Sequence, residues 1–292
     1  MPLTLPSRLA ANCAKTAEGT AWLGHLPSAL RELSDRWAIS MGEPFDSGEV
    51  SCSWVAPVVR RDGAPAILKL GLPHMEGEHE IQGLRFWNGR PTVRLLEADP
   101  DLNAMLLERC GPGTPLRELP EFEQDVVIAN LLVVLWRLPP PPHPFRPLSA
   151  QMRNWSEQTL RHEKRWFDPE LVREGMRLFT ELSQTATREV LLATDLHAGN
   201  VLRARREPWL VIDPKPFIGD PAYDATQHLL NCPNRLCGDP YSTICRFADL
   251  AGVDRERVRL WLLARAAAEP RESWINDRLT TLARAISRLQ VA

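Results

Sequence analysis

The sequence lacks the cysteine pairs and the charge excess that mark several common classes of protein. Its six cysteines are scattered through 292 residues and form no Cys-x-x-Cys pair, which argues against a zinc site and a disulfide scaffold. The formal net charge is −2 and the isoelectric point is near 6.4, so the basic excess of nucleic-acid-binding proteins is missing. We therefore expect reduced thiols and no nucleic-acid partner.

Long apolar runs are also missing. The longest, residues 126–138, is interrupted by Asn130 and Arg137 and is too short to span a bilayer. The first nine residues lack the charged and apolar regions of a signal peptide. These features predict a cytoplasmic protein without a membrane partner, and the 44% hydrophobic content is enough for a buried core. The expected oligomeric state is a monomer or a weak dimer.

What the sequence does contain is an Asp, an Asn and a second Asp in a characteristic order. Asn200 follows Asp195 by five residues, and Asp213 ends the apolar run 209–212. In ATP-dependent phosphoryl transfer, one Asp accepts the proton of the substrate hydroxyl, while an Asn five residues on and a later Asp hold magnesium. The order predicts Asp195 as the base, Asn200 and Asp213 as metal ligands, and ATP and Mg²⁺ as cofactors. The alternative is that these residues only form turns.

The apolar pattern predicts a β-rich first part and a mainly helical second part. An amphipathic helix interrupted at Pro27 is expected at 17–38. Strands are expected at 50–59, 66–70, 93–96 and 104–107, and a helix at 75–87. Later helices are expected at 123–138 (buried), 152–167, 169–185 and 254–269, interrupted only by the hairpin that carries the Asp and Asn residues. A break of glycine and proline predicts an N-terminal nucleotide-binding lobe at 1–108, with a helical extension at 1–40, and a C-terminal catalytic and substrate lobe at 109–292.

A lysine and a glutamate are candidates for the nucleotide side of the site. Lys69 ends the second strand of the first hairpin, and Glu80 follows eleven residues later. In kinases such a pair positions the α- and β-phosphates of ATP. Glu76 and Glu78 are close alternatives to Glu80, and a lone lysine at a strand end is usually a solvated surface residue.

The remaining nucleotide contacts are inferred from position, because the sequence has neither Gly-x-Gly-x-x-Gly nor the Walker motif. A loop over the phosphates is expected at 46–53. There Gly48 would permit close backbone approach, and Ser47 and Ser51 would offer hydroxyl groups. The segment from Glu108 to Cys110 would form backbone hydrogen bonds with adenine.

Taken together, these motifs resemble the aminoglycoside phosphotransferase superfamily, and most closely its streptomycin 6-kinase and hydroxyurea phosphotransferase branch. The resemblance covers about residues 17–275 and includes segments 83–89, 93–96, 195–202, 209–215 and 219–224. It implies an α+β, bilobal, protein-kinase-like fold, with an antiparallel sheet in a small N-terminal lobe and a larger helical C-terminal lobe. ATP and Mg²⁺ would bind between the lobes, and phosphate would pass to a hydroxyl of a small molecule.

The resemblance also assigns roles near the base. Asp224 would support the catalytic loop, although a carboxylate in the first turn of a helix is an alternative explanation. Lys215 could offset phosphate charge. The family usually has His-Gly-Asp where this chain has Ala193-Thr194-Asp195.

Three functions remain open at this point. The first is an O-phosphotransferase that inactivates a hydroxylated antibiotic such as streptomycin. The second is a metabolic or biosynthetic small-molecule kinase of the same fold, which the sequence does not separate from the first. The third is a nucleotide-binding module without turnover, which the change at Ala193-Thr194 raises.

Overall fold

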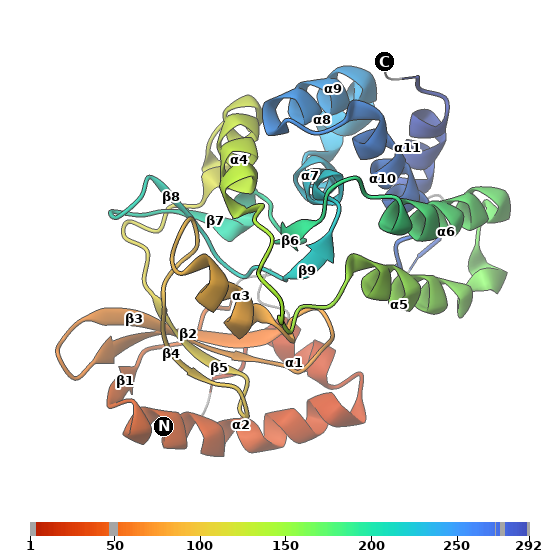
Figure 1. Cartoon of the computed structure of the whole chain (residues 1–292). Coiled ribbons are helices and arrows are strands. Elements are labelled where there is room, and N and C mark those ends of the chain that lie inside the picture. The colour runs from red at the N-terminus through yellow and green to blue at the C-terminus, as the bar shows by residue number, and fades with distance from the viewer. Residues whose placement is uncertain (1–3, 47–51, 272, 275–277, 291–292) are drawn as a thin grey trace. The chain divides into compact units, whose positions relative to one another are not determined.

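The computed structural model describes residues 4–46, 52–271, 273–274 and 278–290 (Figure 1). The chain forms two compact units. The first unit is Met1–Gly113 with Ala204–Arg206, and the second unit is Thr114–Arg203 with Glu207–Ala292. The division falls after Gly113, later than the boundary expected after residue 108, and it assigns a short later segment to the first unit.

The first unit contains a five-stranded antiparallel sheet with the strand order β1-β2-β3-β5-β4. Its strands are β1 (Ile39–Met41), β2 (Ser53–Arg60), β3 (Pro65–Gly71), β4 (Leu95–Asp99) and β5 (Ala104–Glu108). The predicted hairpin of β2 and β3 is confirmed, and Gly63 in its turn has φ +81°. Lys69 on β3 lies opposite Val55 on β2 and Met105 on β5, so it belongs to the central strand.

Two helices flank this sheet (Figure 1). Helix α2 (Ala17–Arg36) packs through Leu26, Leu30 and Leu33 against a buried cluster that includes Leu68 and Leu70 of β3. Because side chains alternate between the faces of a strand, Lys69 projects from the other face. Helix α3 (Glu80–Trp87) supplies its partner there.

Within the first unit, two of the expected helices differ from the structure. Helix α2 continues through Pro27, so the interruption predicted there is wrong. Leu26 and Leu30, on either side of the proline, are both buried. The helix predicted from residue 75 begins only at Glu80, and residues 75–79 form turns around Gly77. A short N-terminal helix, α1 (Ser7–Cys13), lies within the helical extension expected at 1–40, although no separate helix was placed there.

The second unit is mainly helical. Its α-helices are α4 (Glu121–Leu135), α5 (Leu148–Leu160), α6 (Pro169–Gln184), α7 (Pro221–Leu230), α8 (Pro233–Gly238), α9 (Pro240–Ala251), α10 (Arg255–Ala268) and α11 (Arg278–Ser287). It also contains two small antiparallel sheets: β6 (Val190–Leu192) with β9 (Phe217–Gly219), and β7 (Val201–Arg203) with β8 (Trp209–Val211). The predicted hairpin of β7 and β8 is confirmed, whereas the pairing of β6 with β9 was not predicted.

The apolar sequence of α4 predicts a buried helix, but one side of α4 is exposed. Leu132 and Leu135 have no exposed surface, but Phe122, Val126 and Val133 are 59%, 41% and 54% exposed. The helix packs against α7 and α9 on one side only, so the prediction of a fully buried helix is wrong.

The core of the second unit depends on a close approach between α6 and α10. A Cβ atom on Gly175 of α6 would lie 2.8 Å from the Cβ atoms of Ala267 and Ala268 on α10. Small residues on both helices therefore let their backbones come together, which fixes α10 beside the helices that support the site. Within the part of the chain that the structure describes, no helix has the length and apolar character needed to cross a bilayer.

Candidate active site

In the first unit, Lys69 and Glu80 form a buried ion pair. The Lys69 Nζ atom lies 2.6 Å from both carboxylate oxygens of Glu80, and only 5% and 4% of the two residues is exposed. Glu80 is the first residue of α3, where a negative charge is favoured by the helix dipole. Among the acidic residues considered at this position, the structure pairs Glu80 with the lysine.

Glu108, at the end of β5, has its side chain committed to contacts within the first unit. Its carboxylate accepts hydrogen bonds from the backbone N–H of Arg94 and from the guanidinium of Arg206. Burial acts to raise the pKa of Glu108, but the hydrogen bonds from Arg206 and Arg94 outweigh it and lower the pKa below its usual range. Arg206 also donates to the carbonyl oxygens of Gly89 and Thr92, so it joins three segments of this unit.

Cys110 follows two residues later and is half-buried. Burial, followed by the negative charge of Glu108, raises the pKa of Cys110 to about 11, so its thiol is neutral at physiological pH. The residues expected to form a loop over the phosphates, Ser47, Gly48 and Ser51, lie outside the described residues.

In the second unit, the loops before β7 and after β8 hold the predicted Asp and Asn side chains. Asp195 follows β6, Asn200 directly precedes β7, and Asp213 comes shortly after β8. The side-chain amide of Asn200 donates from Nδ2 to the Asp195 carbonyl oxygen at 2.9 Å, and the Asn200 carbonyl accepts from Ile212 N–H at 2.9 Å. Asn200 is thus bonded both to Asp195, before β7, and to Ile212, after β8.

This arrangement suits a divalent cation. Because the amide nitrogen of Asn200 is used in the bond to Asp195, the amide oxygen is the atom that a metal would bind. Asp213 is 40% exposed in its side chain and has φ +53°, a left-handed conformation that Asp tolerates. One carboxylate and one amide oxygen fit Mg²⁺, which takes its other ligands from phosphate and water.

The carboxylate of Asp195 is held from two sides. Lys215 Nζ donates to Oδ2, and Gln227 Nε2 donates to Oδ1 at 2.7 Å. The same lysine nitrogen lies 4.0 Å from Asp213 Oδ2, so one positive charge lies within ion-pair distance of two carboxylates. The structure therefore places Lys215 against the predicted base, a contact that the sequence did not indicate.

Asp224 supports the backbone that leads to Asp195. Its fully buried carboxylate accepts hydrogen bonds from Ala193 N–H (2.9 Å), Thr194 N–H (2.8 Å) and Trp136 Nε1–H (3.0 Å). Burial raises the pKa of Asp224 to about 6 despite these donors. Its contacts are those of a support for the loop, which is the role implied by the resemblance.

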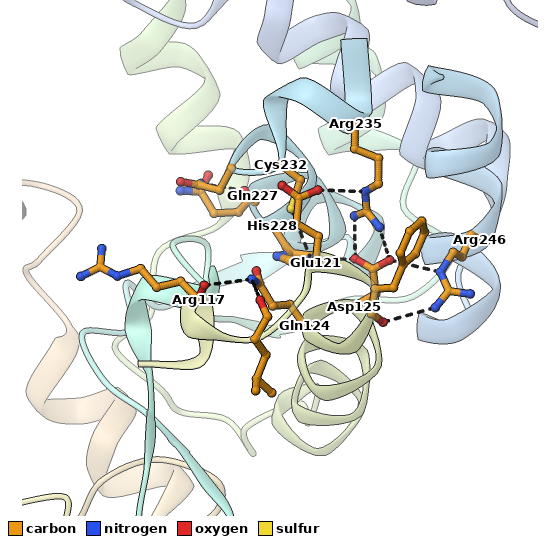
Figure 2. A network of polar contacts seen from close by, with 12 residues as sticks. Arg117, Glu121, Gln124, Asp125, Gln227, His228, Cys232, Arg235 and Arg246 are labelled. Carbon is orange, nitrogen blue, oxygen red and sulfur yellow. Dashed lines mark hydrogen bonds and ion pairs between the residues drawn. The ribbon is translucent and has the colours of Figure 1, made fainter. Parts of the chain in front are cut away.

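Helix α7, which carries Asp224 and Gln227, is anchored by a cluster of charged residues around Asp125 of α4 (Figure 2). The Asp125 carboxylate is 2.8 Å from His228 Nε2 on α7 and accepts two hydrogen bonds from Arg235 of α8, at 2.5 and 2.7 Å. Arg246 of α9 adds a contact at 3.2 Å. The cluster links four helices and fixes the turn of α7 that faces Asp195.

Comparisons with known proteins agree with this geometry. Residues 36–276 match the model of the family described as aminoglycoside/hydroxyurea antibiotic resistance kinase. The chain is 37% identical to a streptomycin 6-kinase of Streptomyces glaucescens, over 89% of this chain and 88% of the relative. It is 36% identical to a streptomycin 6-kinase of Streptomyces griseus, over 91% and 88%. A hydroxyurea phosphotransferase of Kitasatospora aureofaciens is 34% identical, over 85% and 73%.

Solved structures show the same fold at low sequence identity. The choline kinase LicA from Streptococcus pneumoniae has a TM-score of 0.62 and 14% identity, covering 92% of this chain and 94% of that protein. The fructosamine-3-kinase-like protein of Thermobifida fusca has a TM-score of 0.58 and 17% identity, covering 89% and 98%. These likenesses confirm the predicted α+β, protein-kinase-like fold. The chain therefore belongs to the aminoglycoside/hydroxyurea antibiotic resistance kinase family and is a small-molecule phosphotransferase that uses ATP.

Proposed function

We propose that this chain transfers the γ-phosphate of ATP to a hydroxyl of streptomycin, with Mg²⁺ as cofactor and Asp195 as the base. The observation that carries the substrate assignment is the identity of 36–37% to two streptomycin 6-kinases over about nine-tenths of the chain. Asp195 and Asn200 lie in the loop between β6 and β7, and Lys215, in the loop between β8 and β9, contacts Asp195 and lies 4.0 Å from Asp213. This grouping in the second unit supports a phosphoryl-transfer role.

In the proposed reaction, the acceptor oxygen forms a bond to the γ-phosphorus while the bond to the bridging oxygen of ADP breaks. The hydroxyl proton passes to the Asp195 carboxylate, whose two oxygens retain lone pairs beside the hydrogen bonds from Lys215 and Gln227. Bound Mg²⁺ would neutralise charge on the phosphates, and Asn200 and Asp213 would hold it. Lys215 would add a positive charge beside the transferred group.

In the first unit, Lys69 would bind the α- and β-phosphates, with Glu80 fixing its position. The buried pair at 2.6 Å supports this role, because a lysine that is 5% exposed does not behave as a solvated surface residue. The backbone of Glu108 to Cys110 would meet adenine. Ser47, Gly48 and Ser51 remain the proposed phosphate loop.

Hydroxyurea is a second candidate substrate, because a hydroxyurea phosphotransferase is 34% identical to this chain. The alignment covers 73% of that relative, compared with 88% of each streptomycin 6-kinase, so streptomycin is the first choice. We expect the protein to act in the cytoplasm, where ATP is available.

The test is transfer of labelled γ-phosphate from ATP to streptomycin, other aminoglycosides, hydroxyurea and simple sugars, with Asp195→Asn beside the wild type. We expect label on streptomycin, and a loss of about 10² to 10⁴ in rate for Asp195→Asn with ATP binding retained. Label on hydroxyurea alone would favour the second candidate. Label on no acceptor, or near-normal transfer by Asp195→Asn, would contradict the proposal.

A further inference from the structure

Outside the predicted residues, one side chain touches the proposed base from a distant part of the sequence. Gln227 lies 32 residues after Asp195, on α7, and its Nε2 atom donates to Asp195 Oδ1 at 2.7 Å. Nothing in the local sequence assigns this glutamine a role. The contact therefore raises the question of what fixes the glutamine.

A glutamine amide can adopt two orientations that differ only by exchange of its oxygen and nitrogen, and only one of them lets it donate to a carboxylate. In this chain the choice is determined by Arg265 of α10. The Arg265 guanidinium lies 2.7 Å from Gln227 Oε1 and has only N–H donors, so the amide oxygen must face it. The NH₂ group is then directed to Asp195.

Arg265 is itself rigidly held. It is 4% exposed, its Nε donates to Glu269 at 2.8 Å, and its NH1 donates to Thr226 Oγ1 at 2.9 Å. The guanidinium also lies over the rings of Tyr223 and Trp155, at 5.1 and 5.6 Å from their centroids.

The charge of Arg265 is maintained in this buried position. Burial works against the charged form, but Glu269 and Tyr223 outweigh it and raise the pKa above its usual range. A permanently charged, immobile donor is what is needed to hold the glutamine amide in one orientation.

We propose that Arg265 and Gln227 act as a positioning pair that fixes the orientation of the Asp195 carboxylate for the acceptor hydroxyl. This inference rests on the proposed role of Asp195 as the base. The pair acts through the base: Arg265 sets the amide of Gln227, and Gln227 holds one oxygen of Asp195 while Lys215 holds the other. The proposal predicts that loss of the glutamine donor slows phosphoryl transfer without weakening nucleotide binding.

Two substitutions at the glutamine separate positioning from simple packing. Gln227→Glu keeps an acceptor for Arg265 but has no donor for Asp195, so folding should be preserved while the contact to the base is lost. Gln227→Met removes both polar contacts without adding a charge. Gln184→Met, the same exchange at an exposed site in the last turn of α6, is the control.

For both Gln227 variants we expect kcat to fall by about tenfold to 10²-fold, because small displacements of a reacting group have effects of this size. The KM for ATP should change less than twofold, and the melting temperature of Gln227→Glu should stay near that of the wild type. Gln184→Met should match the wild type in all three measurements. Unchanged kcat in both Gln227 variants would overturn the proposal, as would a fall in kcat that is matched by unfolding.

A measurement that does not depend on turnover tests the contact between Gln227 and Asp195 separately from the proposed function. In ¹⁵N NMR spectra, the side-chain NH₂ signals of Gln227, identified by their loss in Gln227→Met, should shift in Asp195→Ala. Signals that do not move would overturn the positioning pair even if the wild type phosphorylates streptomycin. If the signals shift but no acceptor is phosphorylated by the wild type, the contact stands and the proposed substrate assignment fails.

Discussion

At the scale of single residues, Thr194 has a backbone conformation that β-branched residues rarely adopt. Its φ is +42°, directly before the proposed base, and the family resemblance places glycine there. A left-handed conformation costs an L-residue roughly 1–2 kcal/mol. Two contacts offset this cost: Thr194 N–H donates to Asp224, and the Thr194 hydroxyl donates to the Lys215 carbonyl at 2.7 Å.

Substitutions at Thr194 should separate the cost of its left-handed conformation from the contribution of its hydroxyl hydrogen bond. Thr194→Val keeps the unfavourable φ and loses the hydroxyl bond, so the free energy of unfolding should fall by about 1 kcal/mol or more. Thr194→Gly loses the same bond but removes the strain, so its free energy of unfolding should stay within about 1 kcal/mol of the wild type. Denaturant unfolding measures both, and a valine variant as stable as the wild type would contradict this account.

Asp224 should give stability an unusual pH dependence. Its pKa in the folded protein, about 6, lies above its ordinary value of 3.8, so the folded state binds the proton more tightly than the unfolded chain does. The stabilisation from this group is complete below about pH 4 and is lost as the pH rises through about 6. The shift corresponds to roughly 3 kcal/mol. The free energy of unfolding of the wild type, relative to Asp224→Asn, should therefore decrease between pH 4 and pH 6, and a constant difference would contradict the raised pKa.

At the scale of helices and strands, the Asp125 cluster determines how α4, α7, α8 and α9 are joined. Asp125→Ala would leave His228 and Arg235 without their common acceptor in a buried place. We expect a loss of about 3–5 kcal/mol in the free energy of unfolding. Asp249→Ala, which removes an exposed pair with Arg255, is the matched control and should cost less than about 1 kcal/mol. Equal effects of the two substitutions would show that burial of the cluster does not matter.

Acid should weaken the same cluster. Burial acts to raise the pKa of Asp125, but the hydrogen bonds of His228 and Arg235 outweigh it and lower the pKa to about 2. A folded pKa below the ordinary value means that this stabilisation is present above about pH 4 and is lost as the pH falls toward 2. Unfolding of Asp125→Ala should consequently vary less with pH in this range than unfolding of the wild type.

The elements that could be predicted from sequence are those defined by local pattern. The hairpin of β7 and β8 was predicted because Val201 to Ile212 shows two β-prone runs around a turn. Helix α9 was missed, and α7 was raised only as the alternative explanation for Asp224, although each begins with an Asp-Pro pair, at Asp220 and Asp239, whose aspartate caps the helix. The pair alone is not sufficient, because Asp213-Pro214 starts no helix.

The same limit applies to the site. Asp195, Asn200 and Asp213 could be proposed from their spacing, since they lie within one loop and hairpin. Gln227 and Arg265 could not, because their contacts depend on how α7 and α10 pack, and packing between distant segments leaves no local signal. The alternatives at Glu76 and Glu78 could be compared with Glu80 only once the true start of α3 was known.

At the scale of the whole molecule, the residue pair proposed to bind ATP lies in the first unit, and the residues proposed as base and metal ligands lie in the second unit. Their loss should have different consequences. Lys69→Met should weaken ATP binding and also destabilise the first unit, because it removes the buried positive charge that pairs with Glu80. The double variant Lys69→Met/Glu80→Gln should regain stability without regaining affinity for ATP. Thermal shift with ATP, alongside unfolding without it, distinguishes the two effects.

Asp213→Asn should act on the metal instead. We expect ATP to stabilise this variant against heat, but with little further stabilisation when Mg²⁺ is added, whereas the wild type should respond to the metal. Asp195→Asn should behave like the wild type in this assay while failing to transfer phosphate. A normal response of Asp213→Asn to Mg²⁺ would count against its role as a ligand.

The path of the chain has a practical consequence for dividing this protein into fragments. The chain passes from one unit to the other after Gly113, after Arg203 and after Arg206, so the first unit is built from two separate stretches of sequence. A gene cut after codon 113 would produce an N-terminal piece whose Glu108 has lost the guanidinium of Arg206. Split-protein reporters based on this enzyme should therefore be cut within the second unit, so that the N-terminal fragment extends past Arg206 and keeps its own partner for Glu108.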